Sequence, residues 1–231
     1  MLDDVSFDVP RGEVFFIIGA SGVGKSVLIK HLIGLLSPDG GEIWLDGEEI
    51  SKKSEKAMGA VRKKCAMVFQ HSTLFDSMTC VENVALPLRK HKGLSTQAAL
   101  SEARRRLEVV RMHEFADHYP AALGDGMRKR VAIARALTLD PDYVLFDEPT
   151  TSLDPVSARR VDKLILELKT IGVTSIVVSH DLVSIFTIAD TIAMLYKGKV
   201  RLIGRREDFK NSTDGIVQQF ICGRATGPMD L

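Results

Sequence analysis

The sequence predicts an α/β fold: a mainly parallel sheet with an antiparallel β subdomain and an inserted helical subdomain. Apolar runs of strand length, such as Val14–Ile18, alternate with helical patterns along much of the chain. A glycine-rich stretch joins that run directly to a helix, and residues 71–140 break the alternation with helical periodicity alone. We therefore interpret residues 1–231 as one domain, with a core of 1–70 and 141–231 around a helical subdomain of 71–140.

The first part of the core is predicted to contain four strands and one helix. Val5, Phe7 and Val9 alternate with polar residues, a pattern typical of a half-buried strand. Val14–Ile18 is apolar throughout, as expected of a strand that is covered on both faces. The other elements are a helix over Lys25–Leu35, a strand over Glu42–Leu45 before an Asp46-Gly47 turn, and a buried strand over Cys65–Phe69.

The helical subdomain and the second part of the core follow the same rules. Apolar residues at helical spacing predict a helix over Gln97–Arg111 and another from about Met127 to Leu137. The core resumes with a strand over Tyr143–Phe146, an amphipathic helix after Pro155, a strand over Thr174–Val178, and a hairpin of Ile192–Leu195 with Val200–Ile203.

Composition argues against several classes of function. The chain has 31 basic and 30 acidic residues, a balance that gives no electrostatic reason to expect a nucleic-acid partner. Its three widely spaced cysteines argue against a disulfide framework or a zinc site. Its apolar runs are shorter than the about 20 residues that cross a bilayer. We expect a chain that does not cross a membrane by itself but could dock onto a protein that does.

The stretch GASGVGKS at Gly19–Ser26 fits the phosphate-binding pattern G-x-x-x-x-G-K-[ST], here called the P-loop. Its glycines let the backbone curl so that N–H groups point at phosphate oxygens, and the following helix adds its positive end. Lys25 supplies a cation for the outer phosphates, and the Ser26 hydroxyl can ligate Mg²⁺. A chance glycine-rich turn is the alternative, but the strand before the loop and the helix after it favour phosphate binding.

Polar side chains also end the other predicted buried strands. Asp147 and Glu148 follow an apolar strand, where Asp147 can hold Mg²⁺ and Glu148 can accept a proton from an attacking water. His180 and Gln70 end two more strands. Because the carboxyl ends of parallel strands meet at one edge of a sheet, we expect these residues to line a common site. The alternatives are solvated strand-end carboxylates and a loop histidine with a local hydrogen bond.

Taken in order, GASGVGKS, VFQ, RVAIARAL, VLFDEP, SLD and SH resemble the motifs of ABC-transporter ATP-binding subunits, which are P-loop NTPases with a RecA-like core. The resemblance covers almost the whole chain. It implies that ATP and Mg²⁺ are the cofactors, with Mg²⁺ held by Ser26, Gln70 and Asp147. It implies catalytic roles for Glu148, His180 and Gln70, and a D-loop role for Asp154. The ATP-binding residues that it implies are Gly19, Ala20, Ser21, Gly22, Val23, Gly24, Lys25, Ser26 and Val27.

Finer features resemble the ATPases of Mla/Mce lipid-transport systems: the stretches His71–His91 and Gly126–Arg130, and the ending around Val217–Phe220. This implies movement of phospholipid or a related lipid through a multi-span permease, with a periplasmic Mce-domain protein and room for a small accessory subunit. It places the chain peripherally on the cytoplasmic face of the inner membrane. The family's ATP site also implies a homodimer, in which the P-loop of one copy faces the signature loop of the other.

The signature loop, Gly124–Met127, departs from the family's LSGGQ pattern. Gly124 replaces a serine, Asp125 replaces a glycine, Gly126 matches, and Met127 replaces glutamine as in the Mla-like group. Asp125 could cap the following helix. It could also repel a phosphate charge about 6 Å away by roughly 3 kcal/mol at an effective dielectric near 20, which the basic run Arg128–Arg130 would partly offset. We expect slow but real hydrolysis.

Three further points leave alternatives open: the adenine contact, the role of the chain in its complex and the cargo. Family members stack adenine on an aromatic residue in a strand upstream of the segment that resembles Val5–Val9, and this chain begins too late to contain it. The altered signature also allows a nucleotide-binding switch that regulates a membrane complex without transport. A third possibility keeps transport and changes the cargo to another hydrophobic molecule.

Overall fold

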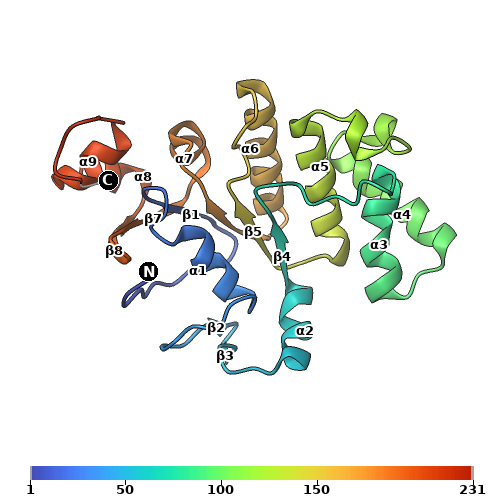
Figure 1. Ribbon diagram of the computed structural model, residues 1–231, viewed down its shortest axis with the longest axis horizontal. Helices are drawn as coiled ribbons and strands as arrows, with labels where there is room; N and C mark the ends of the chain where they lie inside the picture. Colours follow the sequence, from blue (N-terminus) through green and yellow to red (C-terminus); the bar gives the residue numbers. More distant parts are fainter. Residues whose placement is uncertain (1, 230–231) are drawn as a thin grey trace.

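The structure is a computed structural model that describes residues 2–229 of the chain. Within them, one sheet has the strand order β4-β5-β6-β1-β7-β8 (Figure 1). The strands are β4 (Cys65–Val68), β5 (Tyr143–Asp147), β6 (Thr174–Val178), β1 (Val14–Ile18), β7 (Thr191–Tyr196) and β8 (Lys199–Gly204). All neighbours pair in parallel except β7 and β8, which form the predicted antiparallel hairpin. The predicted α/β fold with a mainly parallel sheet is confirmed.

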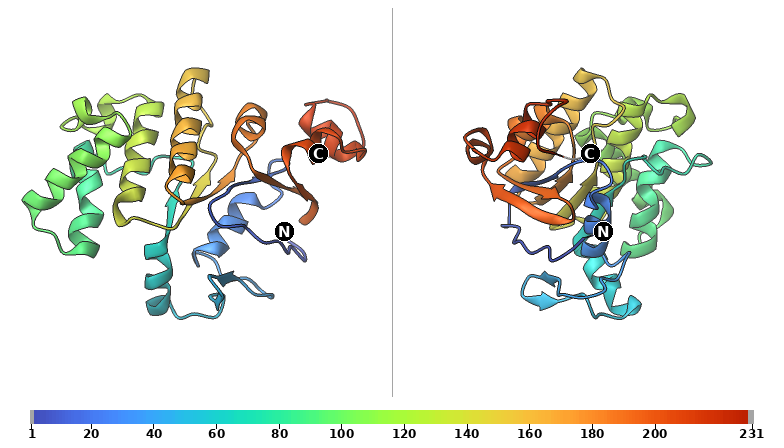
Figure 2. Two further views of the ribbon diagram at one scale, coloured as in Figure 1. Left: turned by 180° about the vertical axis from the view of Figure 1, so that it is seen from behind. Right: turned by 60° about the vertical axis from the view of Figure 1, so that its left-hand side comes forward.

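Helices cover both faces of this sheet (Figures 1 and 2). Residues of α1 (Lys25–Leu32) and α2 (Glu55–Lys64) join one apolar cluster with alternate residues of the strands. Residues of α5 (Asp125–Ala136), α6 (Pro155–Thr170) and α7 (Leu182–Ile188) join the cluster on the other face. Short helices α8 (Arg206–Lys210) and α9 (Gly215–Ile221) follow β8.

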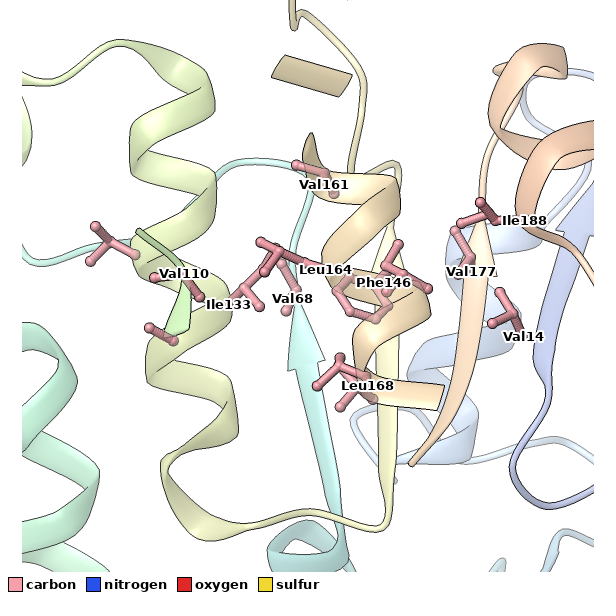
Figure 3. Close-up of a cluster of buried hydrophobic side chains, with 14 of the residues drawn as sticks. Val14, Val68, Val110, Ile133, Phe146, Val161, Leu164, Leu168, Val177 and Ile188 are labelled. Atoms are coloured by element: carbon pink, nitrogen blue, oxygen red, sulfur yellow. The ribbon is translucent and has the colours of Figure 1, made fainter. Parts of the chain in front are cut away.

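The two clusters follow from strand geometry, because successive side chains point to opposite faces of a sheet. In β1, Phe16 lies in the cluster beneath α5, α6 and α7, whereas Phe15 lies in the cluster beneath α1 and α2. Figure 3 shows the first of these clusters, where Leu164 of α6 packs with Phe146 of β5. Burying such a side chain contributes about 1.5–3 kcal/mol to folding, so the core holds the strand ends firmly in place.

A helical insertion separates β4 from β5, which are neighbours in the sheet. It contains α3 (Cys80–Lys92), α4 (Thr96–Val109), two short 3₁₀ turns (His113–Phe115 and Pro120–Ala122) and α5. A capping box of Thr79 with Glu82 starts α3, and Gly93 ends it at a φ of 66°. The insertion leaves the sheet at the carboxyl end of β4 and returns through a third 3₁₀ turn (Leu137–Leu139) to the amino end of β5.

The expected strand over Val5–Val9 is wrong, although its alternation of exposed and half-buried residues is present. No strand is assigned to these residues, which have no neighbouring strand for a hydrogen-bond ladder within residues 2–229. Their inward side chains instead pack on the sheet. The Phe7 ring stacks on Phe15 with the ring centroids 5.4 Å apart.

Two other expectations are wrong in detail, and one helix was not expected. The helix expected over Lys25–Leu35 ends at Leu32, and Gly34 then turns the chain at a φ of 64°. The strand expected over Glu42–Leu45 shrinks to β2 (Trp44–Leu45), which pairs with β3 (Glu48–Glu49) around the predicted turn. Sequence periodicity did not reveal α2 because only Met58 and Val61 of that polar helix are buried.

Within residues 2–229, no helix combines the length and hydropathy needed to cross a bilayer.

Candidate functional site

The P-loop lies between β1 and α1, and its glycines meet backbone demands that other residues could not meet without strain. Gly19, Gly22 and Gly24 have φ angles of 143°, 79° and 107°. A Cβ on Gly19 would also overlap the carbonyl oxygen of Leu195 in the neighbouring strand β7. Gly24 immediately precedes the first turn of α1. The loop conformation is therefore fixed by the strand before it, the helix after it and the strand beside it.

The Lys25 ammonium lies inside the curl of the P-loop. Its Nζ donates hydrogen bonds of 2.8 and 2.9 Å to the carbonyl oxygens of Gly19 and Ala20, and the residue is only 8% exposed. Burial lowers the pKa of Lys25, while the nearby charges of Glu148 and Asp147 act in the opposite direction. Such a cation, held next to backbone N–H groups at the start of a helix, suits the binding of phosphate.

The first residues of α1 contact the end of β5. The Ser26 hydroxyl donates a 2.7 Å hydrogen bond to Asp147 Oδ1. Asp147 is 6% exposed, and Val27 follows Ser26 on the same helix. A hydroxyl and a carboxylate oxygen in contact offer two hard oxygen ligands, the kind that Mg²⁺ prefers.

Glu148 follows Asp147 with a backbone φ of 48°, which is uncommon for a residue other than glycine. Its amide donates to the Val178 carbonyl at 2.9 Å, so the β6 strand end holds this turn. The side-chain Oε2 lies 2.9 Å from His180 Nδ1 and accepts a 3.1 Å hydrogen bond from the Thr151 hydroxyl. No hydrogen bond from residues 2–229 falls on the other carboxylate oxygen, which leaves that oxygen free to accept a proton.

His180 itself is 62% exposed in its side chain, but the loop around it is held. The next residue, Asp181, caps α7 by accepting hydrogen bonds from the amides of Val183 and Ser184. Arg159 of α6 donates a 2.6 Å hydrogen bond to the same carboxylate. The structure thus brings Lys25, Ser26, Asp147, Glu148 and His180 to one edge of the sheet, as the sequence predicts.

Gln70 makes no hydrogen bond to that group within residues 2–229. It is exposed at the end of β4, and its side chain makes no hydrogen bond with the described part of the chain. It lines a cleft of about 520 Å³ together with residues 71–74, Asp125, Lys129 and the turn of residues 151–153. No P-loop residue lines this cleft. Thr151, which bonds to Glu148, lines the same cleft, and the expected role of Gln70 as a Mg²⁺ ligand stays a prediction.

The signature loop differs from one sequence expectation. Asp125 does not cap α5: it is the first helical residue, the cap position is Gly124, and no side chain bonds there. Of the basic run, one residue contacts Asp125 directly. Arg128 pairs with Asp125, but Lys129 bonds to the carbonyls of Phe69 and Gln70, and Arg130 bonds to the carbonyls of residues 110 and 111.

Asp154, for which the resemblance implies a D-loop role, serves as the cap of α6. Its carboxylate accepts 3.0 Å hydrogen bonds from the amides of Val156 and Ser157, and the bonds with Ser157 lower the pKa of Asp154. Gly126 packs so closely on Ser157 that a Cβ there would lie 2.8 Å from its hydroxyl oxygen. The signature loop and the D-loop helix are therefore in direct contact.

Two residues at the site escaped sequence reasoning. Thr151, which bonds to Glu148, carried no motif signal beyond its place after Pro149. The sequence assigns Lys129 only to the basic run that partly offsets the Asp125 charge, yet it is 2% exposed, and burial lowers its pKa to about 8. Its spacing offered a signal, since residues 132 and 133, three and four positions further on, are apolar and buried on the same helix face.

Comparison with known proteins covers nearly the whole chain. The ABC transporter family pattern matches residues 2–151. The intermembrane phospholipid transport system ATP-binding protein MlaF of Escherichia coli strain K12 is 40% identical over 99% of this chain and 86% of its own length. The probable ribonucleotide transport ATP-binding protein mkl of Mycobacterium leprae is 37% identical over 99% of this chain and 66% of its own length.

Solved structures resemble the fold closely. An ATP-binding cassette, solved as a dimer in a post-hydrolysis state with ADP and Pi, matches with a TM-score of 0.81 and 31% identity, covering 88% of this chain and 90% of that one. The protein cbiO1 from Clostridium perfringens, part of the ABC transporter complex cbiONQ, matches with a TM-score of 0.83 and 30% identity, covering 91% of this chain and 84% of that one.

Proposed function

This chain belongs to the ABC transporter family and is an ATP-binding, ATP-hydrolysing subunit, and we propose that it powers the movement of phospholipid or a related lipid through a membrane permease. The observation that supports ATP hydrolysis by these residues is the group of polar side chains at the carboxyl edge of the sheet. There the P-loop serine meets Asp147, and Glu148 next to it keeps one carboxylate oxygen free.

In the proposed mechanism, the P-loop amides and Lys25 bind the phosphates of ATP. Glu148 takes a proton from the attacking water, and the His180 imidazole, 2.9 Å from Glu148 Oε2, orients that carboxylate. The left-handed backbone of Glu148, held by the Val178 carbonyl, keeps the base beside the strand end rather than in solvent. Thr151 adds a second restraint on the same oxygen.

We propose that Ser26 and Asp147 hold Mg²⁺, with the Gln70 side chain joining them from the cleft. Residues 2–229 contain no cluster of three or more His, Cys, Asp or Glu side chains suited to a metal. The hydroxyl–carboxylate pair fits an ion that arrives with its nucleotide, because Mg²⁺ commonly binds one or two carboxylates together with substrate phosphates. When bound, the ion would neutralise phosphate charge.

We propose that two copies of the chain form the working unit. Asp125 of the signature loop lines a cleft that no P-loop residue lines. We infer that the signature loop does not contact a phosphate bound to the P-loop of its own copy. A head-to-tail homodimer would bring the signature loop of one copy to the P-loop of the other. The dimeric cassette with ADP and Pi supports this arrangement by analogy.

The lipid assignment rests on the named function of the Escherichia coli relative across 99% of this chain. We propose that the chain sits peripherally on the cytoplasmic face of the inner membrane, bound to a multi-span permease, with a periplasmic Mce-domain protein and room for a small accessory subunit. The Mycobacterium leprae relative is named for ribonucleotide transport, so the identity of the cargo needs a direct test.

The test is to purify the complex that this chain forms in its own cells and to identify the bound molecules by mass spectrometry. Phospholipid in a complex with a multi-span permease, together with ATP hydrolysis that Glu148→Gln abolishes, is the expected result. A single-span partner with no bound lipid would favour a regulatory nucleotide switch. Bound ribonucleotide or another hydrophobic cargo would overturn the lipid assignment while leaving the ATPase assignment intact.

A further inference from the structure

Lys129 is a buried ammonium that reaches from the signature helix to the backbone at the end of β4. Its Nζ donates hydrogen bonds of 3.0 and 2.6 Å to the carbonyl oxygens of Phe69 and Gln70. The side chain comes from the second turn of α5, whose first residue is Asp125 of the signature loop. The Lys129 side chain therefore joins two segments of the chain that are 59 and 60 residues apart in sequence.

This arrangement is unusual because buried ammonium groups are normally paired with carboxylates. No carboxylate in the described residues forms an ion pair with Lys129, which is 2% exposed, and Asp147 and Asp125 act on it only from a longer range. An apolar side chain would fill the same position at a lower desolvation cost. The ammonium is therefore better explained by the two carbonyls that it holds than by the stability of the core.

A second cation of the same helix holds the next part of this segment. Arg135 donates hydrogen bonds of 2.9 and 3.0 Å to the carbonyl and hydroxyl oxygens of Thr73. Thr73 itself has a φ of 47°, a strained backbone that needs such support. The backbone around Gln70 is thus tied to α5 at two places, while the Gln70 side chain remains unbonded in the cleft.

We propose that Lys129 is a positioning residue that ties the Gln70 backbone to the signature helix, so that the Gln70 side chain and the signature loop move as one body when ATP closes the dimer. The inference rests on the proposed function, because it assigns Lys129 to the same catalytic cycle. In this proposal Lys129 acts on the catalytic cycle through the Gln70 backbone that it holds. A permease segment that pushes on the Gln70 segment would therefore displace the signature loop with it.

The test compares Lys129→Met with Lys129→Arg in the full chain bound to its membrane partners, with Mg-ATP as the probe. Methionine keeps the side-chain length and removes the donors, so we expect kcat to fall about tenfold with the KM for ATP changed by less than about twofold. Arginine keeps donors for both carbonyls and should restore at least about half of kcat. Lys92→Met, which breaks the ion pair with Asp140 in the same helical insertion, is the matched control and should leave kcat unchanged.

A double-mutant cycle with Gln70→Ala separates positioning from mere stability. If Lys129 acts through Gln70, Lys129→Met lowers kcat less than about twofold in the Gln70→Ala background, so the two effects are not additive. Additive effects, or a full kcat in Lys129→Met, would overturn the inference. Should Lys129→Met melt below the assay temperature, the same cycle with Lys129→Gln decides it. Wild-type chain without ATPase activity would instead count against the proposed function.

Discussion

The P-loop and the signature loop both lead into a helix through a glycine at the cap position, with no side chain bonded there, yet they are held in different ways. Gly24 before α1 has a φ of 107° and is buried, whereas Gly124 before α5 has a φ of −69° and open space around its Cα. The first glycine is required by the chain's own backbone. The second is not, so any demand on Gly124 comes from outside this copy of the chain.

The same contrast extends to the polar groups. In the P-loop, Lys25 and Ser26 both have partners within the fold. In the signature loop, Asp125 is exposed, and its one side-chain partner within residues 2–229 is Arg128, three residues along the same helix. One half of the proposed ATP site is therefore preorganised by one copy, and the other half presents a surface that a second copy would complete in the proposed homodimer.

The largest expected effect comes from removing the base on the preorganised side. Glu148→Gln should lower kcat by roughly 100-fold or more, in the range for loss of a general base. It should also trap an ATP-bound dimer, because hydrolysis no longer reopens it. Light scattering after size exclusion with saturating Mg-ATP measures this, and a Glu148→Gln chain that stays monomeric would contradict the dimer and the comparison with it.

A matched pair of alanine substitutions tests the difference between the glycines. Gly19→Ala places a methyl group against the Leu195 carbonyl oxygen, at a residue whose φ is 143°. We expect the free energy of unfolding to fall by roughly 1–3 kcal/mol and ATP binding to be lost. Gly124→Ala has ordinary backbone and free space, so its stability should change by less than about 0.5 kcal/mol. Chemical denaturation of both variants measures the difference. Equal losses would show that both loops are constrained from within.

The charge on the signature loop should matter less than its position suggests. Since Arg128 already pairs with Asp125 at an exposed site, Asp125→Asn should raise the kcat of the complex only about two- to fivefold, in line with the about 0–1 kcal/mol of exposed ion pairs. Arg128→Gln leaves the carboxylate uncompensated and should lower kcat by a similar factor. Steady-state phosphate release measures both. An unchanged rate in both variants would remove the repulsion argument.

The smallest effect is expected where the family's serine is restored. Gly124→Ser fits the extended backbone at this cap, which has a ψ of 162°, and should change stability by only a few tenths of a kcal/mol. Any gain in kcat, expected below about twofold, would come from contact with ATP on the second copy. Comparing kcat of the dimer with ATP binding by the isolated chain distinguishes the two. A change in ATP binding by the isolated chain would place Gly124 in the site of its own copy.

The sequence predicted most of what local patterns control. Val14–Ile18 is a continuous apolar run and Thr174–Val178 is rich in β-branched residues, and they form β1 and β6 with the predicted bounds. The strand ends then carried Asp147, Glu148 and His180 to one edge, because parallel strands share their direction. Val5–Val9 shows where this reasoning stops, since alternation predicts which side chains face inward but not whether a neighbouring strand supplies a ladder.

By itself, the sequence determined the sheet, the P-loop and the residues around it, because their signals are periodicity, glycine spacing and motif order within short segments. Only the tertiary structure decided that Gln70 lines one cleft with Asp125 and Lys129, that Asp125 starts α5 rather than capping it, and that Lys129 is buried on the carbonyls of Phe69 and Gln70. Those contacts join segments about 60 residues apart. Such pairings depend on the packing of whole helices against the sheet, which no local pattern records.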